Sequence, residues 1–284
     1  MGPIKYFPIF LLILVACKEP EQLHHQFSIP SPGKNLTSLE GIELGKKIFF
    51  FESENKSGKM SCASCHKPDS GFSSASMRFI NGVKRQVPSL YNLAFSQRFM
   101  WDGREKNLES LVIKPLANHE EMDQNLQEMI FKMNQNQELK DEFNLVFGSD
   151  SIYTALVSRA LAQYMRSLIK LVPDQNTRAG KILFENHCVN CHKGKFSSDF
   201  GLRYSVVAAS GPDSGKFRIS GKPIDIFTFK TPSLAKIRLT SPYMHDGRYR
   251  NLNEVVVAYS KILKIKELKS VQAQYTLVKF LEQL

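Results

Sequence analysis

Two short segments of the chain carry a pair of cysteines separated by two residues and followed directly by a histidine. They are Cys62, Cys65 and His66 in the first segment, and Cys188, Cys191 and His192 in the second. Two thiols at this spacing can form thioethers with the vinyl groups of a haem, and the adjacent histidine can ligate its iron. The pattern therefore predicts two covalently attached c-type haems.

Three other interpretations of these motifs compete with haem attachment. A redox disulfide of the thioredoxin kind is disfavoured because no alternation of strands and helices surrounds either motif, and because it leaves the histidines unexplained. A shared zinc site is disfavoured because the motifs lie 126 residues apart (188 − 62), beyond the usual spacing of zinc ligands. Chance is disfavoured because the motif occurs twice and uses four of the five cysteines.

The fifth cysteine, Cys17, ends an apolar N-terminal segment. Residues 6–16 are too few to span a bilayer, which is typical of an export signal. Leu-Val-Ala-Cys at 14–17 resembles a bacterial lipobox, in which the cysteine is lipidated; a buried cysteine in a hydrophobic helix is the alternative. We expect a signal peptide over 1–17, a flexible tether over 18–37, and a periplasmic protein held to a membrane by its lipid anchor alone.

The composition excludes several classes of protein. With 42% hydrophobic and 23% charged residues among 284, the chain can bury a core, so long disordered, collagen-like and multi-span membrane classes are excluded. A formal net charge of +11 could suit nucleic acid. For an exported haem protein, however, it favours an acidic redox partner or anionic lipid, and we expect no nucleic-acid partner.

The second part of the chain repeats features of the first. Residues 88–112 and 232–256 align without gaps, share ten of 25 positions, and contain Pro-Ser-Leu followed by Asp-Gly-Arg. Ahead of each haem motif, residues 45–49 (GKKIF) resemble residues 180–184 (GKILF). An internal repeat of this kind predicts two homologous haem domains.

Hydrophobic spacing and the repeat together predict the fold class. We expect a mainly α protein of two tandem cytochrome c-like haem domains with long loops, over 38–172 and 173–284, joined at a Pro-Asp turn near residues 171–176. Glycines, prolines and β-branched residues between Tyr204 and Phe229 favour one short β-hairpin in the second domain. Helices are predicted over Ser38–Phe50, Leu126–Phe147, Ser151–Leu171, Thr177–His187 and Val271–Leu284.

The segments CASCH, VPSLYNLAFSQRFMWDGR, CVNCH and TPSLAKIRLTSPYMHDGR together resemble those of the bacterial di-haem cytochrome c peroxidases and the related MauG enzymes. The resemblance covers residues 38–284. It implies that the first haem, ligated by His66, reduces hydrogen peroxide, and that the second, ligated by His192, takes electrons from a cytochrome c or a cupredoxin. It also implies that Trp101 carries electrons between the haems, although a core tryptophan would fit the sequence too.

The resemblance further implies a catalytic glutamate twenty residues after this tryptophan. The position is Glu121, which is followed by Met122 as in the family. A carboxylate beside bound peroxide can move a proton from one peroxide oxygen to the other, and an apolar pocket should raise its pKa. Glu120 and His119 are alternatives, and two surface glutamates on a loop would also fit.

Three positions depart from the peroxidase pattern. Residues 67–88 contain no histidine, whereas peroxidases that need reductive activation carry one there, so we expect the first haem to be open or water-bound when oxidised, and active without prior reduction. The sixth ligand of the second haem, usually methionine, falls at Tyr259, the MauG-like choice, with Met244 as the alternative. A phenolate ligand lowers the potential of the iron. Leu111 replaces a glutamine that helps to position peroxide.

The family also holds a calcium ion between its domains, bound by one asparagine side chain and backbone carbonyls. The matching positions are Gln86, Thr240 and Pro242, and glutamine supplies the same carbonyl group from a longer stem. Arg104 and Arg248 are expected to pair either with haem propionates or with neighbouring aspartates. Dimers are common in the family, so the resemblance allows a homodimer.

The sequence leaves three functions open. The first is a lipid-anchored di-haem peroxidase that reduces hydrogen peroxide to water. The second is a MauG-type oxidase that oxidises side chains of another protein; Tyr259 and the absent histidine favour it, but with Trp101 as the single tryptophan a route to the surface would need tyrosines. The third is an electron carrier or redox sensor with no catalytic role for Glu121.

Overall fold

The computed structural model describes residues 29–55, 58–80, 82–173, 178–209 and 211–284. The expected signal peptide, Cys17 and most of the tether lie outside the described residues. Within the described ranges, no helix has both the length and the apolar character needed to cross a membrane.

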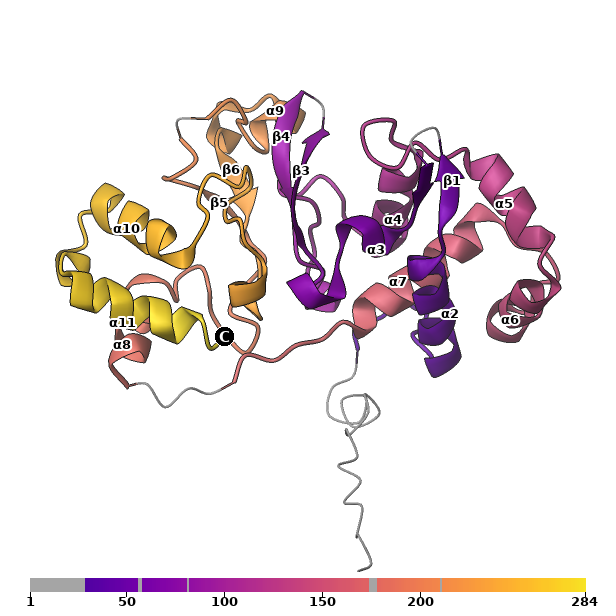
Figure 1. Ribbon diagram of the computed structural model, residues 1–284, viewed down its shortest axis with the longest axis horizontal. Helices are drawn as coiled ribbons and strands as arrows, with labels where there is room; N and C mark the ends of the chain where they lie inside the picture. The colour runs from indigo at the N-terminus through magenta and orange to yellow at the C-terminus, as the bar shows by residue number, and fades with distance from the viewer. Residues whose placement is uncertain (1–28, 56–57, 81, 174–177, 210) are drawn as a thin grey trace, which may run out of the picture.

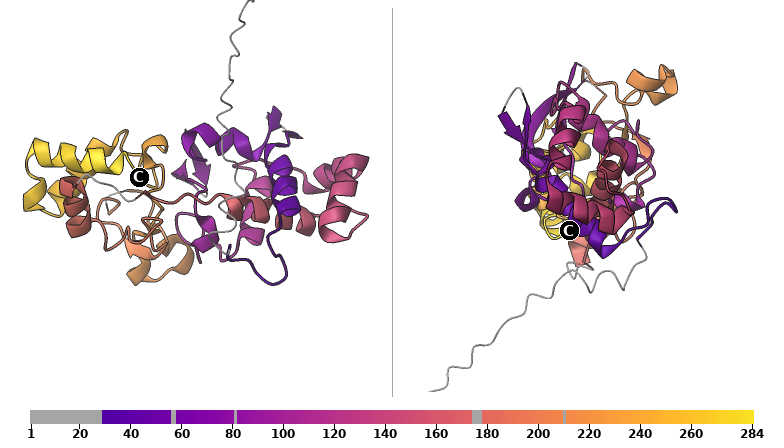
Figure 2. Two further views of the ribbon diagram at one scale, coloured as in Figure 1. Left: turned by 90° about the horizontal axis from the view of Figure 1, so that it is seen from below. Right: turned by 90° about the vertical axis from the view of Figure 1, so that its right-hand side faces the viewer.

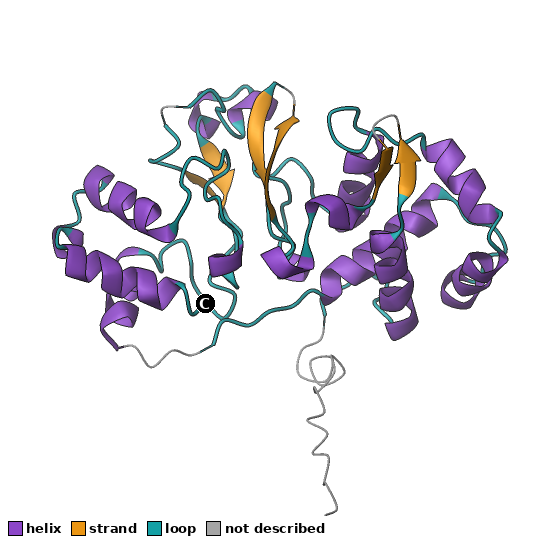
Figure 3. Ribbon diagram, viewed as in Figure 1, coloured by secondary structure: helices purple, strands orange, loops and turns teal. Residues whose placement is uncertain are grey.

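The molecule is elongated, with helices at both ends and paired strands between them (Figure 1; Figure 3). Residues 38–172 supply one helical end and residues 173–284 the other, as the view from below in Figure 2 also shows; we refer to them as the N-terminal and C-terminal halves. This architecture confirms the predicted mainly α fold class. The helices are α2 (Leu39–Phe50), α3 (Cys62–Cys65), α4 (Leu108–Ala117), α5 (Leu126–Asn134), α6 (Gln137–Phe147), α7 (Thr154–Ser167), α8 (Arg178–His187), α9 (Phe217–Ser220), α10 (Leu252–Ile262) and α11 (Val271–Leu281).

The strands form three antiparallel pairs. They are β1 (Ser53–Asn55) with β2 (Gly58–Met60), β3 (Ser74–Ile80) with β4 (Val83–Val87), and β5 (Leu202–Tyr204) with β6 (Thr228–Lys230). The β3–β4 and β5–β6 pairs stand between the two helical ends (Figure 3).

Each half has its own hydrophobic core. The first cluster is drawn from residues 42–165 and includes Phe49 and Phe143; the second is drawn from residues 184–284 and includes Leu277. Burial of such side chains is the main favourable term in folding, so each half has an independent source of stability.

Glycine lets the principal helices of each half cross at close range. α2 crosses α7 at Gly45, where a Cβ atom would lie 2.0 Å from the carbonyl oxygen of Ala160. α8 crosses α11 at Gly180, where a Cβ atom would lie 2.6 Å from the Cβ of Phe280. A side chain at either glycine would push the helices apart. These are the glycines that the sequence repeat aligns, so both halves use the same device.

Other backbone features recur 144 residues apart (236 − 92). The pairs are the left-handed residues Asn92 and Lys236, and Met100 and Met244; the bridges Phe99–Glu105 and Tyr243–Tyr249; and the helix caps Asn107 and Asn251. The sequence repeat therefore corresponds to a repeated backbone path.

The helix predicted over Leu126–Phe147 is wrong in one respect, because the structure divides it into α5 and α6. Asn136 leaves the helical conformation, and its side chain accepts a hydrogen bond from the Leu139 amide. Asparagine favours this capping role over a helix interior, which explains the break. α2 begins as predicted after Ser38, whose side chain accepts from the Gly41 amide, while α7 and α11 are shorter than predicted.

The hairpin expected between Tyr204 and Phe229 is also corrected. β5 and β6 do pair there, but the register joins Leu202 to Lys230 and Tyr204 to Thr228, so a long loop and not a tight turn connects them. The hairpins β1–β2 and β3–β4 of the N-terminal half were not expected. Many of their residues are exposed, so the apolar alternation that marks a half-buried strand is weak.

Backbone hydrogen bonds join the two halves reciprocally. The Gln86 amide donates to the His245 carbonyl oxygen at 2.7 Å, and the Lys230 amide donates to the Trp101 carbonyl oxygen at 2.7 Å. Gln86 corresponds to Lys230 in the repeat, and Trp101 to His245. The same contact is therefore made twice with the halves exchanged, and Trp101 lies at the junction.

Candidate functional site

The first cysteine motif forms the single helical turn α3. The Ser61 amide, just before the turn, donates to the Ser64 hydroxyl at 3.0 Å, which fixes how the turn begins. Cys62 and Cys65 are not bonded to another cysteine. Burial raises the pKa of the Cys62 thiol to about 12. Both sulfurs remain available for thioether bonds.

His66 follows this turn and is oriented for metal binding. Its Nδ1 lies 2.9 Å from the carbonyl oxygen of Phe72. Because a carbonyl can only accept, Nδ1 carries the proton and the lone pair is on Nε2. Burial lowers the pKa of His66, which favours the neutral imidazole that a metal requires.

A large pocket brings this motif together with residues from other elements. Its atom-free space, including the part open to solvent, is about 1520 Å³. Cys62, Cys65 and His66 line the pocket, as do Trp101 and Glu121. Paired thiols, a neutral histidine and this space fit a covalently attached haem.

Glu121 lies in the loop after α4, at the edge of this pocket. The Asn118 side-chain amide donates to its Oε2 at 2.9 Å. Burial raises the pKa of Glu121, although the hydrogen bond from Asn118 opposes the shift. The direction is the one expected for a carboxyl group that exchanges a proton near neutral pH.

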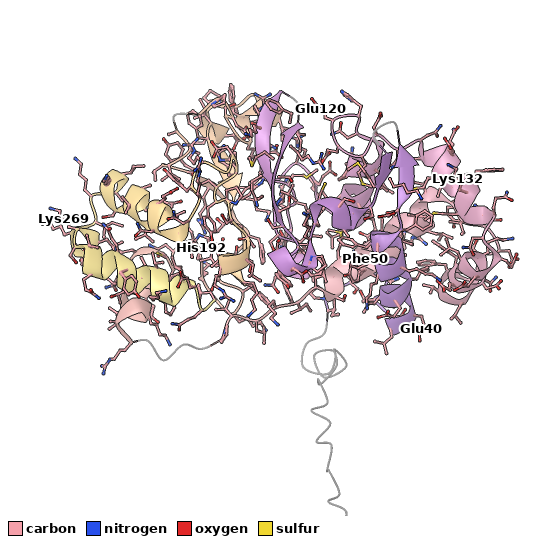
Figure 4. All side chains as sticks on the ribbon, in the orientation of Figure 1. Glu40, Phe50, Glu120, Lys132, His192 and Lys269 are labelled. Atoms are coloured by element: carbon pink, nitrogen blue, oxygen red, sulfur yellow. The ribbon has the colours of Figure 1, made fainter. Side chains whose placement is uncertain are left out.

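The neighbouring alternatives do not share this position. Neither Glu120 nor His119 lines the pocket, and Figure 4 shows Glu120 at the upper edge of the molecule. Leu111 does line the pocket, so an apolar side chain from α4 stands where the resemblance implies a glutamine.

Trp101 is fixed between the halves through both its side chain and its backbone. The indole Nε1 donates to the carbonyl oxygen of Gln86 at 2.8 Å, and the Trp101 carbonyl accepts from the Lys230 amide. His245, its counterpart in the repeat, is 3% exposed and stacks on Phe229 with 4.0 Å between ring centroids. Matching positions therefore hold chemically different side chains.

The second cysteine motif repeats the geometry of the first. Cys188 and Cys191 are not bonded to another cysteine, and burial raises the pKa of Cys188 to about 12. The Nδ1 of His192 lies 3.1 Å from the carbonyl oxygen of Ser197, so Nδ1 again carries the proton, and burial lowers the pKa of His192. His192 lies on the side of the C-terminal helices (Figure 4).

Tyr259 and Met244 differ in their relation to this second motif. Burial raises the pKa of Tyr259 to about 12, and the charges of Cys191 and Cys188 contribute, while a hydrogen bond with Ser205 opposes the shift. The phenol of Tyr259 therefore lies close enough to the cysteine pair to interact with it. Met244 has a left-handed backbone, with φ of 71°, as its counterpart Met100 has in the other half.

The residues expected to bind calcium do not fit a cation. The Ser73 hydroxyl donates to the Val87 carbonyl at 2.7 Å, so it must accept at 2.7 Å from the Gln86 side chain, whose Nε2 is the only donor. This fixes the amide with Nε2, and not its oxygen, toward the Thr240 carbonyl at 3.5 Å. A hydrogen-bond donor therefore occupies the direction that a calcium ion would need. No cluster of three or more His, Cys, Asp or Glu suited to a metal occurs among the described residues.

Removing calcium should therefore leave the junction unchanged. We expect the same thermal unfolding midpoint and the same Trp101 fluorescence after exhaustive treatment with a calcium chelator and after calcium is added back. Differential scanning calorimetry and fluorescence spectroscopy check both. A rise in the midpoint that saturates with added calcium would contradict the amide orientation of Gln86.

A buried ion-pair network crosses between the halves beside Trp101. Arg85 Nε donates to Asp213 Oδ2 at 2.7 Å, and the same guanidinium pairs with Asp102, which also accepts from Arg104 Nε at 2.9 Å. The side chains of Arg85, Asp102 and Asp213 are 4%, 0% and 2% exposed. Arg248 likewise pairs with its neighbour Asp246 at 3.0 Å. Arg104 and Arg248 thus each pair with the aspartate two residues before it, which is one of the two kinds of partner that were expected.

Sequence reasoning missed three basic residues that line the pocket. Arg78 and Arg85 lie on the unexpected β3–β4 hairpin, and Lys230 ends β6 in the C-terminal half. No motif marks the first two. The sequence offers one weak signal for Lys230, because it is a single charged residue that follows the uncharged residues 226–229.

Known proteins resemble this chain over most of its length. Residues 39–178 match the family model described as di-haem cytochrome c peroxidase. The methylamine utilization protein MauG of Methylorubrum extorquens is 30% identical over 82% of this chain and 72% of its own length. The cytochrome c551 peroxidase of Nitrosomonas europaea is 29% identical over 78% of this chain and 72% of its own. The relatives thus include both MauG proteins and peroxidases.

Two solved structures share the fold. A MauG-like protein associated with microbial copper homeostasis superimposes with a TM-score of 0.77 at 23% identity, covering 89% of this chain and 91% of that one. The diheme peroxidase BthA from Burkholderia thailandensis gives a TM-score of 0.70 at 18% identity, covering 88% and 87%. At these identities the likeness concerns the fold alone.

Proposed function

Because the chain belongs to the family of di-haem cytochrome c peroxidases and MauG proteins, we propose that it reduces hydrogen peroxide to water with electrons from a small redox protein. The donor is a cytochrome c or a cupredoxin. The observation that carries the proposal is the pocket in which Glu121 and Trp101 share one space with Cys62, Cys65 and His66. A proton-transfer group, an oxidisable ring and a haem-attachment set are thereby combined.

The residues of this pocket divide the chemistry between them. When bound, haem supplies the iron that receives peroxide and electrons. His66 would hold that iron through Nε2, because Nδ1 is committed to the Phe72 carbonyl. Glu121 takes the proton from one peroxide oxygen and delivers it to the other, so that the O–O bond breaks with loss of water. In the complete reaction, two electrons and two protons convert each peroxide into two waters, of which the first is the one lost when the O–O bond breaks.

The C-terminal half is proposed to receive the electrons. Cys188, Cys191 and His192 attach the second haem there, and Trp101 relays electrons from it to the first pocket. The fixed position of the indole between the halves supports this relay, because its Nε1 and its carbonyl are both hydrogen-bonded. On this reading residues 38–172 form the peroxidatic domain and residues 173–284 the electron-transfer domain.

The first haem is proposed to be accessible in the oxidised resting protein. The segment 67–88, which supplies a blocking histidine in some peroxidases, contains none; its described residues form the β3–β4 hairpin and the turn before it. Peroxide should therefore react without prior reduction of the protein.

Replacing Tyr259 by Phe should raise the reduction potential of the second haem and change its ferric spectrum, because a charge-donating oxygen ligand is lost. Replacing Met244 by Leu should leave both unchanged. Optical spectroelectrochemistry of the holoprotein measures both quantities for each variant. The reverse result, with only the Met244 variant altered, would assign the ligand to Met244.

The second candidate function is a MauG-type oxidase of protein side chains, favoured by Tyr259 and by the 30% identity to MauG of Methylorubrum extorquens. Tyr91 and Tyr164 are oxidisable side chains near the first pocket, although Tyr164 is buried and these rings do not by themselves reach the surface. Tyr91 lines the pocket and packs against Phe72 with centroids 5.4 Å apart, and Phe72 packs against Tyr164 at 6.5 Å. Aromatic rings at such spacing favour stepwise transfer of an oxidising equivalent. A carrier or sensor without catalysis is the third candidate.

The proposed location rests on the expected signal peptide and on Cys17. Cys17 is proposed to be lipidated after export, so that the folded part, beginning at about residue 38, lies in the periplasm on a tether. A periplasmic location agrees with the similarity to cytochrome c peroxidases. The resemblance to the family also allows a homodimer. Mass spectrometry of the mature N-terminus tests the anchor.

The test of function mixes holoprotein with peroxide in the presence and absence of a reduced cytochrome c, while haem spectra and peroxide loss are recorded. Rapid oxidation of the cytochrome supports the peroxidase. A long-lived altered haem spectrum with slow oxidation of the cytochrome supports the MauG-type oxidase, and no reaction supports the carrier.

A further inference from the structure

We propose that Lys230, a residue of the C-terminal half, forms an ion pair with a propionate of the haem that is attached in the N-terminal half. The inference rests on the haem attachment of the proposed function, but not on peroxide chemistry. It assigns to the second repeat a direct contact with the cofactor of the first.

The geometry brings Lys230 into the first pocket. Lys230 is the last residue of β6, and its amide donates to the Trp101 carbonyl at 2.7 Å, which ties its backbone to the N-terminal half. It lines the same pocket as Cys62, Cys65 and His66 and is 9% exposed. A residue of one repeat thus reaches the haem-attachment site of the other.

The remaining basic residues of the pocket already have partners. Arg85 is paired with Asp102 and Asp213, and Arg104 donates to Asp102. Arg78 donates to the Cys65 sulfur at 2.6 Å. By contrast, Lys230 makes no ion pair with any described residue; its Nζ lies 5.5 Å from the centroid of the Phe200 ring. Arg78 and Lys230 are therefore the pocket cations that pair with no carboxylate among the described residues, and Lys230 is the one supplied by the C-terminal half.

The charge balance of the pocket points to an anionic occupant. Of the four basic side chains that line it, Arg85 and Arg104 are balanced by Asp102 and Asp213. This leaves Arg78 and Lys230 against Glu121, the one acidic side chain among the described lining residues. Burial lowers the pKa of Lys230 to about 8, which reflects the cost of a cation kept from water without a counter-charge. A haem carries two propionates, and a carboxylate beside Lys230 would remove that cost.

The two halves differ at this position, because only the C-terminal half carries a charged residue there. The counterpart of Lys230 is Gln86, whose amide makes the matching bond to His245 but whose side chain is neutral and turned toward Ser73. A positive charge is therefore supplied to the first haem at a position where the repeat supplies none to the second. A nearby cation favours the reduced, less positive state of iron, so the charge raises the potential of the first haem relative to the second.

The test uses holoprotein with Lys230→Met, Lys230→Arg and, as a control on the exposed surface of the same half, Lys222→Met. Spectroelectrochemistry gives the midpoint potential of each haem, and a pyridine haemochrome assay counts the haems. We expect Lys230→Met to shift the potential of the first haem downward with the second unchanged. Lys230→Arg should restore most of the shift, and Lys222→Met should shift neither haem.

Two results would overturn the proposal. One is an unchanged first-haem potential in a Lys230→Met protein with full haem content; the other is a shift confined to the second haem. Loss of the first haem in Lys230→Met but not in Lys230→Arg would support the ion pair, since charge and not folding distinguishes those variants. A wild-type protein that takes up no haem at the first motif would instead refute the proposed function, and the haem count separates that failure from the others.

Discussion

Replacing Glu121 by Gln should lower the rate of peroxide turnover by about 10²–10⁴-fold, the usual contribution of a general acid–base group. Glutamine keeps the shape of the side chain and can still interact with Asn118, but it cannot take and return a proton. Steady-state assays with a reduced cytochrome c measure the effect. Leu111, in the same pocket, offers no hydrogen bond and cannot compensate.

The matched control is Glu120→Gln, which removes the same charge from a neighbouring residue that does not line the pocket. It should retain near-normal turnover. Turnover should also fall on the acid side, because the carboxylate must be ionised to take the proton, and burial raises the pKa of Glu121. The fall should therefore begin at a higher pH than for an ordinary glutamate. Equal losses in both variants, or none in Glu121→Gln, would remove Glu121 from the mechanism.

Replacing Arg85 by Met should destabilise the folded protein by about 3–5 kcal/mol, the range for removing one partner of a buried ion pair. The Asp213 side chain, which is 2% exposed, would lose its charged partner, and Asp102 would keep only Arg104. Chemical denaturation followed by circular dichroism measures the free energy of unfolding. The exposed Lys47, which pairs with Glu138 and Glu142, is the control, and Lys47→Met should cost at most about 1 kcal/mol.

The effect of Arg85→Met should depend on pH in a definite direction. Burial alone would raise the pKa of Asp102 and Asp213, but hydrogen bonds from Arg104 and Arg85 outweigh it and the pKa of each is lowered. A lowered pKa contributes stability above the unfolded value of about 4, and that stability is lost as pH falls through the folded value. The difference between variant and wild type should therefore be largest near neutral pH and shrink in acid. A difference that does not vary with pH would show that the network contributes little through its charges.

Much of the site could be predicted from local sequence. A haem motif needs two thiols and a histidine within five residues, so its chemistry is visible without the fold. The repeat of residues 45–49 at 180–184 likewise predicted homologous halves, and the structure shows that Gly45 and Gly180 each allow a close helix crossing. The position of Glu121 relative to Trp101 came from the family resemblance, and no local physical rule would have selected it over Glu120.

The rest depended on contacts between distant parts of the chain. Arg85 meets Asp213 across 128 residues of sequence, and neither residue belongs to a recognisable motif. Lys230 directly follows the region of the expected hairpin in the second half, and only the reciprocal junction brings it to the first pocket. The fit of the predicted calcium site likewise depends on such a contact, since the hydroxyl of Ser73, the residue just before β3, decides which end of the Gln86 amide faces Thr240.

The central claim is that peroxide is reduced at the Glu121 pocket by electrons that enter from a protein donor. The most direct measurement is the number of reduced cytochrome c molecules oxidised for each peroxide consumed. We expect two cytochrome c molecules to be oxidised for each peroxide consumed, with no release of dioxygen. The Glu121→Gln variant should show the same ratio at a far lower rate. Peroxide loss with dioxygen release, or with no oxidation of the donor, would contradict it.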